Sequence, residues 1–335
     1  MLLRRIAFAG CLLAVSLSAS TARAVDPKIL PNDTEVVIQL NLKQMRESEL
    51  AKSNKALIEK AMEQARAKID ESPAKKYLEK AGFDPLKDLH SITIAGPAAK
   101  DLDSGFVVVE GKFDVEKFNT AAEDAAKENG DAAKVHKIGG KTVFEITPNG
   151  EKTVFASLIS PTTLVAASNK DGLADGISRL GGGKTSKLSP AFKSILPTIS
   201  NKQSFSMALT SNVLNNGLKE APIPQNQDAA DTLKQIDAIS FSVTLGKTIE
   251  IAGTLIAKDN DSAKKMSAMG NVGMLFIKGM AGQKAKEDVK LQPAVDVLNS
   301  VRIGDSGDRV TLRAEITQEN LEKLMAILPK GAGGL

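Results

Sequence analysis

Residue types that commonly do chemistry are scarce in this chain of 335 residues. It contains one cysteine, Cys11, and two histidines, His90 and His136. A transition-metal site would need both histidines and several carboxylates brought together by folding. The sequence shows neither a G-x-S-x-G motif nor a recognisable serine–histidine nucleophile arrangement. The residues therefore predict no catalytic, cofactor-binding or metal-binding site.

One segment resembles part of a phosphate-binding loop. Gly183-Lys184-Thr185 matches the end of the G-x-x-x-x-G-K-[ST] motif, whose backbone amides hold phosphates. The motif requires a glycine five residues before Gly183, and Ser178 stands there. The segment also follows a helix-like run, whereas a phosphate loop follows a strand and opens a helix. A flexible linker is the better interpretation.

Acidic residues cluster at 101–103, 259–261 and 304–308. Paired carboxylates can act as acid and base or bind Ca²⁺. None of the clusters has the spacing of a twelve-residue calcium loop with its final glutamate. They fall at expected turns and helix starts, where Asp and Asn bind backbone amides, so we predict a structural role.

A methionine-rich helix is expected over residues 264–282, which read KKMSAMGNVGMLFIKGMAG. Its apolar side chains could form an adaptable surface for a partner or an apolar ligand. Alternatively, the helix covers its own sheet and methionine fills gaps in the packing. We expect the second role, because the pattern of elements requires a covering helix at this position.

The first 24 residues have the features of a signal peptide. A basic start is followed by an apolar stretch and a small-x-small end, which predicts cleavage after Ala24 and no transmembrane anchor afterwards. Lipidation of Cys11 is the weaker alternative, because too short an apolar stretch precedes it. Cleavage would remove three arginines, leaving 41 basic and 40 acidic residues and a net charge of about +1. We expect a periplasmic or extracellular protein without disulfides that does not bind nucleic acid.

Elements can be expected from periodicity. Strands with one apolar side are expected at 35–42, 248–257 and 308–316, and a meander of up to four short strands at 134–168. Hairpin turns are expected at Gly139-Gly140, Asn149-Gly150, Gly246-Lys247 and Ser306-Gly307. Helices are expected over 44–70, 115–128, 170–180, 262–281 and 318–327, with Asp114 and Thr317 as N-caps.

Similar strand patterns occur at 88–96, 235–243 and 297–305. A strand–turn–strand–helix unit recurs at 89–128, 236–280 and 299–327. The sequence therefore predicts an α+β fold, with mostly antiparallel sheet covered by helices. A glycine-rich stretch near 179–190 divides the mature chain into two halves of similar pattern, 25–183 and 184–335. One continuous sheet without a true domain boundary is the alternative.

Four segments resemble a group of uncharacterised exported proteins of planctomycete-type bacteria. They are ILPNDTEVVIQLNLKQMRESEL, GFDPLKDLHSITIAG, FVVVEGKFDVEKF and TTLVAASNKDGLADGI. The resemblance implies a protein of the bacterial envelope or a secreted protein, and it implies no activity and no site residues.

The leading hypothesis is an exported, non-enzymatic binding or structural protein of the bacterial envelope. Another envelope protein or an apolar ligand is a possible partner. The near absence of Trp and Tyr disfavours a lectin or a glycosidase. Two alternatives remain: an envelope hydrolase that uses scattered carboxylates, and a carrier or holdase that binds apolar ligands through the 264–282 helix.

Overall fold

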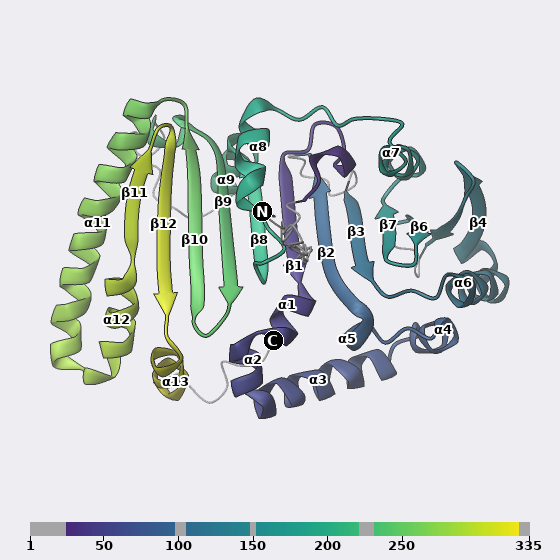
Figure 1. Cartoon of the computed structure of the whole chain (residues 1–335), viewed down its shortest axis with the longest axis horizontal. Helices are drawn as coiled ribbons and strands as arrows, with labels where there is room; N and C mark the ends of the chain where they lie inside the picture. The colour runs from purple at the N-terminus through teal and green to yellow at the C-terminus, as the bar shows by residue number, and fades with distance from the viewer. Residues whose placement is uncertain (1–24, 98–104, 148–151, 221–230, 328–335) are drawn as a thin grey trace, which may run out of the picture.

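The computed structural model describes residues 25–97, 105–147, 152–220 and 231–327. These residues form one antiparallel sheet of twelve strands in the order β11-β12-β10-β9-β8-β1-β2-β3-β7-β6-β5-β4 (Figure 1). Helices pack against this sheet, so the fold is α+β, as predicted. The strands are β1 Val36–Asn41, β2 Leu89–Gly96, β3 Phe106–Gly111, β4 Ala133–Ile138, β5 Lys141–Ile146, β6 Val154–Ser160, β7 Thr163–Ala167, β8 Phe205–Thr210, β9 Ile236–Leu245, β10 Ile249–Ala257, β11 Arg302–Ser306 and β12 Arg309–Ile316.

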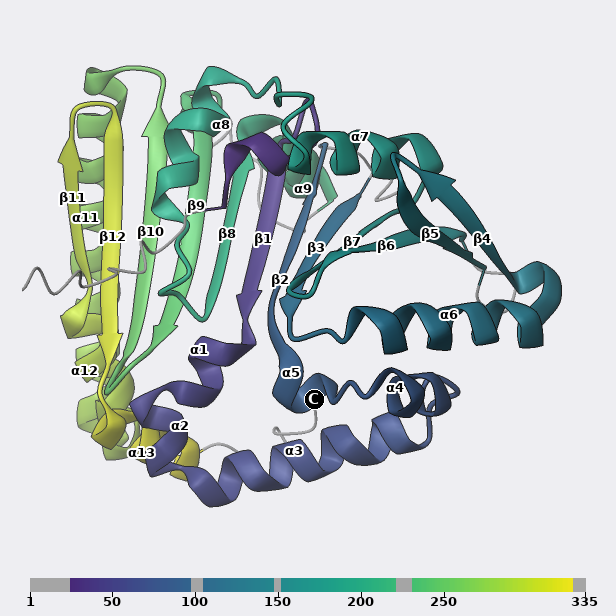
Figure 2. The ribbon, with the colours of Figure 1, turned by 45° about the vertical axis from the view of Figure 1, so that its right-hand side comes forward.

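Helices lie on both faces of the sheet and at one end of the strands (Figure 2). The α-helices used below are α1 Leu42–Glu47, α2 Glu49–Ser53, α3 Lys55–Asp70, α4 Lys75–Ala81, α5 Pro85–Asp88, α6 Val115–Asn129, α7 Lys170–Leu180, α8 Pro190–Ile195, α9 Ser211–Glu220, α11 Asn260–Glu287, α12 Gln292–Ser300 and α13 Gln318–Ile327. Helices α7 and α8 cover one face of the sheet. Helices α6 and α11 cover the opposite face at its two ends. Residues of α6 line one cavity together with Phe144 of β5, and residues of α11 line another together with Leu255 of β10.

The chain follows the same route in its two halves. In the first half, α6 follows the β2–β3 hairpin, and a meander then returns until β7 pairs with β3. In the second half, α11 follows the β9–β10 hairpin, and β12 returns to pair with β10. The halves join where β1 pairs with β8, so strand pairing continues from one half to the other. Helices α6 and α11 therefore occupy equivalent positions in the topology.

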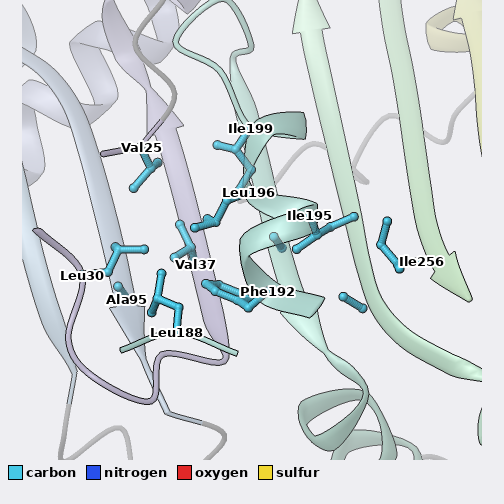
Figure 3. Packing of buried hydrophobic residues seen from close by; sticks show 12 residues of the cluster. Val25, Leu30, Val37, Ala95, Leu188, Phe192, Ile195, Leu196, Ile199 and Ile256 are labelled. Carbon is cyan, nitrogen blue, oxygen red and sulfur yellow. The ribbon is translucent and has the colours of Figure 1, made fainter. Parts of the chain in front are cut away.

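Most of the fully buried side chains lie on the face covered by α7 and α8. Around α8, Phe192, Ile195 and Leu196 pack against strand residues such as Val37 and Ile256 (Figure 3). A second cluster forms under α7 around Phe106. Close approach of α7 requires glycine at Gly176, because a Cβ there would lie 2.2 Å from the Phe106 ring.

Several local predictions are confirmed. The side chain of Asp114 accepts a hydrogen bond from the Lys117 amide (3.1 Å), and Thr317 accepts one from the Asn320 amide (3.2 Å). Both are N-caps, which satisfy amides that have no partner within the helix. Glycines with positive φ occupy the predicted turns at Gly139-Gly140 and Ser306-Gly307, where a side chain would be strained.

Three local predictions are wrong. The expected helix over 44–70 is broken into α1, α2 and α3, because Ser48 adopts an extended conformation and caps α2 through its hydroxyl. A type II′ turn at Gly246-Lys247 would need a positive φ at Gly246, which the structure does not show. In the third strand repeat, residues 297–300 belong to α12, and strand β11 begins only at Arg302.

The alternating pattern of β1 correctly predicts a strand, but the burial of its two sides differs from the expectation. The apolar side chains of Val36, Ile38 and Leu40 are only half-buried, while Gln39 and Asn41 on the other side are buried. Hydrogen bonds make this possible, because Asn41 donates to the Asn201 carbonyl oxygen (2.6 Å) and accepts from the Gln44 amide (2.9 Å). The α8 layer thus covers the side of β1 that holds both polar and apolar residues. The other side of β1, which is more apolar, is less fully buried.

Some predictions concern parts of the chain outside the described residues. They are the signal peptide at 1–24 with its cleavage after Ala24, lipidation of Cys11, the acidic cluster at 101–103 and the Asn149-Gly150 turn.

Candidate functional site

Helix α11 is the longest described helix and lies at the outer end of the sheet (Figures 1 and 2). It begins where the side chain of Asp259 accepts a hydrogen bond from the Ser262 amide (2.7 Å). Its inner side packs on the sheet through small residues: Ala263 and Ser267 are buried, and Gly270 lies against Ile303 of β11. The Lys278 ammonium group also donates to the Val301 carbonyl oxygen (3.3 Å), which ties the middle of the helix to the segment before β11.

The opposite side of α11 is apolar and exposed. Its largest side chains are strongly exposed, with values of 68% for Val272, 71% for Leu275 and 69% for Phe276. We define the α11 outer face as the exposed apolar residues Val272, Leu275, Phe276, Ile277 and Met280; Met269 is also exposed but borders the cavity between α11 and the strands. Most of these positions are three or four residues apart, so they form one stripe along the helix.

Lysines predominate among the charges near the outer face. Between residues 262 and 286 the chain carries five lysines and no Asp or Glu. Lys264 and Lys265 lie near the start of the helix, and Lys284 and Lys286 near its end, all with exposed side chains. Acidic residues follow directly beyond them, Asp259 and Asp261 at the helix start and Glu287 and Asp288 at its end, so lysines are the only charged residues along the apolar stripe itself.

The 264–282 segment therefore combines a side that covers the sheet with an exposed apolar side. Its inner side covers the sheet as expected, with Met266 and Gly270 beside the strands. Its outer side is an exposed apolar surface, which the preference for a purely covering helix did not predict. The informative signal was the bulk of Val272, Leu275 and Phe276 together with the absence of acidic residues, because a solvent-facing side normally carries charges of both signs.

A polar cleft of about 570 Å³ near the start of β2 contains groups that bear on the hydrolase alternative. Ser91 donates a hydrogen bond to Glu110 Oε2 (2.7 Å), and these residues are register partners on β2 and β3. His90 lines the same cleft; burial lowers its pKa, and the positive charges of Lys43 and Arg46 act in the same direction. The serine proton is thus held by a carboxylate in a cross-strand pair, whereas a serine nucleophile is normally activated by an imidazole.

The other candidate residues have structural roles. Lys184 forms an ion pair with Asp175 of α7, and residues 181–185 lie between α7 and α8, as expected for a linker. His136 Nε2 lies 2.6 Å from Glu145 Oε2 on the neighbouring strand, a carboxylate partner that the sequence did not reveal. Among the described residues, no group of three or more His, Cys, Asp or Glu side chains is placed to hold a metal ion.

Comparison with known proteins provides little further information. No family model and no curated protein matches the chain. Among solved structures, crystal forms III and IV of TP0453, a Treponema protein, align over 91% and 92% of this chain and 99% of their own chains, at 14% and 13% sequence identity. The TM-scores are 0.45 and 0.47, and crystal form I gives 0.43, so these similarities carry no argument about function.

Proposed function

We propose that this chain is a non-enzymatic protein of the bacterial envelope that binds an anionic lipid surface through the α11 outer face. The observation that carries the proposal is the continuous stripe of exposed, bulky apolar side chains on a helix whose inner side already covers the sheet. Full burial of one such side chain is worth about 1.5–3 kcal/mol. Folding does not supply this stabilisation to the outer face, but contact with an apolar phase would.

A lipid surface fits the shape and the charge of the α11 outer face. Helix α11 lies at the outer end of the molecule (Figure 1), and the stripe occupies the exposed side of this single helix, whereas recognition of a peptide or small ligand normally uses a groove. Helices that lie in a membrane interface combine an apolar side with lysines, which are attracted to anionic headgroups. No described helix is long and apolar enough to cross a bilayer, so the contact we propose is peripheral.

An envelope location is consistent with the expected signal peptide and with the resemblance to exported bacterial proteins. A protein inside an envelope compartment has a membrane surface within reach on each side of that compartment. Cleavage after Ala24 would leave the α11 outer face as the principal means of attachment.

Vesicle flotation tests the proposal. Purified residues 25–335 are mixed with vesicles of phosphatidylcholine alone or of equimolar phosphatidylcholine and phosphatidylglycerol. We expect flotation with the anionic vesicles, weakened by high salt because salt screens lysine–headgroup attraction. The variant Val272→Gln/Leu275→Gln/Phe276→Gln should lose binding at least about tenfold, because three apolar side chains no longer enter the interface.

A matched pair of single variants provides the control. Leu275→Gln removes an exposed leucine from the α11 outer face, and Leu57→Gln removes a 51%-exposed leucine from α3. Only the first should weaken flotation. Equal flotation of the triple variant and the unmodified chain would refute the proposal. If the unmodified chain does not float but forms dimers by light scattering that the triple variant lacks, the outer face is an interface between copies and the lipid proposal is wrong.

A further inference from the structure

A second apolar feature lies at the other end of the sheet. A cavity of about 550 Å³ is enclosed by α4, α6 and the strands β4 and β5. Its size is within the range of about 300–1,000 Å³ that is typical of small-molecule sites. The cavity shares no residue with the α11 outer face.

Alanine is the main lining residue of this cavity. Eight alanines line it: Ala74, Ala81, Ala121, Ala122, Ala125, Ala126, Ala132 and Ala133. Their methyl groups are too short to fill the space between the two helices and the sheet. Phe118 of α6 and Phe144 of β5 also line the cavity, and Phe144 is only 4% exposed, so part of the cavity wall is aromatic and well buried.

Polar contacts hold α4 and α6 together beside the cavity. Lys76 forms an ion pair with Glu128 (2.5 Å) and Lys80 one with Asp124 (3.1 Å). The hydrogen bond from Lys76 lowers the pKa of Glu128, and the hydroxyl of Tyr77 donates a second hydrogen bond to the same carboxylate (3.0 Å). These exposed contacts connect α4 and α6 beside the alanine-lined space.

The apolar lining continues onto the open surface of the sheet. Val135, Ile146 and Val154 lie on the adjacent strands β4, β5 and β6 and are about 40% exposed. The register pairs Ile146 with Val154, and it pairs Val135 with Phe144, so all of these side chains share the face on which the cavity lies. A ligand could therefore extend along an apolar track from the cavity to this edge of the sheet.

The other lining residues include the charged Lys134 and Glu145 on neighbouring strands and four polar, uncharged residues. Tyr77 and Asn129 lie together, since the Asn129 amide donates to the Tyr77 hydroxyl (2.9 Å), and Ser72 and Thr147 also line the cavity. Tyr77 is the only tyrosine of the chain. A predominantly apolar cavity with a few hydroxyl and amide groups suits a ligand with a long apolar part and a small polar end.

We infer that the cavity between α4, α6 and the β4–β5 hairpin binds the acyl chain of a single-chain amphiphile. A free fatty acid and a lysophospholipid share this chemistry, and the experiment separates them. The inference does not depend on the lipid-surface proposal, because its residues, elements and predicted ligand are different.

Titration with 11-(dansylamino)undecanoic acid, a fluorescent fatty acid, tests the inference on residues 25–335. The emission of the probe should rise and shift to shorter wavelength as its chain enters an apolar site. Displacement by palmitic acid but not by lysophosphatidylcholine would identify a fatty acid site, and the reverse would identify a lysolipid site. An unmodified chain that does not bind the probe would overturn the inference.

Variants locate the binding site. Ala122→Leu/Ala125→Leu adds side-chain volume to two cavity-lining positions and should weaken probe binding at least about tenfold without lowering the melting temperature. Ala67→Leu adds the same volume to an exposed position of α3 and should leave binding unchanged. Should the double variant fail to fold, Ile146→Gln at the exposed edge decides the question, because it should weaken binding while leaving the core intact.

Two further results would contradict the inference. One is unchanged probe affinity in the cavity variants. The other is loss of probe binding in the Val272→Gln/Leu275→Gln/Phe276→Gln variant, which would place the bound probe on α11. Failure of the unmodified chain to float with anionic vesicles while it still binds the probe, by contrast, would refute the lipid-surface proposal alone.

Discussion

Helices α6 and α11 occupy equivalent places in the fold and differ most on the side that faces away from the sheet. Each follows the second strand of a hairpin, crosses the same face of the sheet and leads to strands that return towards the centre. Helix α6 has 15 residues and α11 has 28. The inner sides of both helices contact the sheet, so coverage of strands does not explain the difference between their outer sides.

The outer side of α6 is polar, with Glu116, Thr120, Glu123 and Lys127 exposed. Helix α4 packs beside it, and the ion pairs Lys76–Glu128 and Lys80–Asp124 connect the two helices. On α11 the corresponding side carries Val272, Leu275 and Phe276 in strongly exposed positions. Helix α11 therefore carries more apolar surface than its own fold buries, as is expected of an interaction surface.

Glycine content separates the two helices further. Helix α6 contains no glycine, whereas α11 contains Gly270, Gly273, Gly279 and Gly282. Only Gly270 has a steric reason within the described structure, because a Cβ there would lie 3.2 Å from Ile303, while a Cβ at Gly273 or Gly279 would meet nothing within 4 Å. The open positions reduce the helix propensity of α11 and allow its outer side to adapt to a contacting surface.

The largest expected effect comes from matched phenylalanine truncations under α6 and on α11. Phe144→Ala should lower the free energy of unfolding by about 3–5 kcal/mol, because it removes a buried ring. Phe276→Ala should change it by no more than about 0.5 kcal/mol, since the ring is exposed. Urea denaturation of residues 25–335 measures both. A loss of several kcal/mol for Phe276→Ala would mean that the fold itself buries the α11 outer face and would remove the contrast.

A smaller effect of opposite sign is expected from glycine replacement on α11. Gly273→Ala/Gly279→Ala should raise the free energy of unfolding by about 1–2 kcal/mol, because alanine favours the helix by up to ~1 kcal/mol at each position and finds open space. Gly270→Ala serves as the contrast, since its methyl group would crowd Ile303 and should cancel the gain. Urea denaturation again provides the measurement. Destabilisation by the double variant would show that the outer side of α11 is not free in the folded chain.

The sequence predicted the elements well because their signals are local. Asp114 and Thr317 act as caps within three residues of the amides they bind, and Gly139-Gly140 forms a turn from its own backbone preferences. Helix breaks at Ser48 and Asn54 were missed because the apolar spacing of residues 44–70 continues across them. Strand order could not be read from local patterns, since the β1–β8 pair joins residues that are far apart in the chain.

The sequence predicted the helix that carries the candidate surface but not which side of it is exposed. Periodicity correctly placed a helix over 262–281, but it cannot state which apolar side a helix buries when both sides are apolar. The same limit applies to β1, where the half-buried side holds Val36, Ile38 and Leu40 while hydrogen-bonded Gln39 and Asn41 are buried. In both elements, partners distant in sequence decide burial. The cavity between α4 and α6 could not be predicted for the same reason. Its lining alanines leave empty space only because of how the two helices are placed, and the sequence does not give that placement.

The smallest expected effect concerns the starts of the two helices, where they should behave alike. The amide of Lys117 donates to Asp114 and the amide of Ser262 donates to Asp259, and these hydrogen bonds lower the pKa of each carboxyl from its ordinary value of 3.8. Because the folded pKa lies below the unfolded one, each charged cap stabilises the fold above about pH 4, and this contribution is lost as the pH falls through the folded pKa.

Asp114→Asn and Asp259→Asn keep an acceptor oxygen and remove the charge, so each should lower the melting temperature slightly at neutral pH. The difference from the unmodified chain should shrink as the pH falls through the lowered pKa of each aspartate, where the aspartates themselves become neutral. Melting curves recorded across this range by circular dichroism measure both variants. Similar changes in melting temperature for the two variants would mean that α6 and α11 differ only on their outer sides. A shift for Asp114→Asn without one for Asp259→Asn would instead show that the first turn of α11 contributes little to the stability of the free protein.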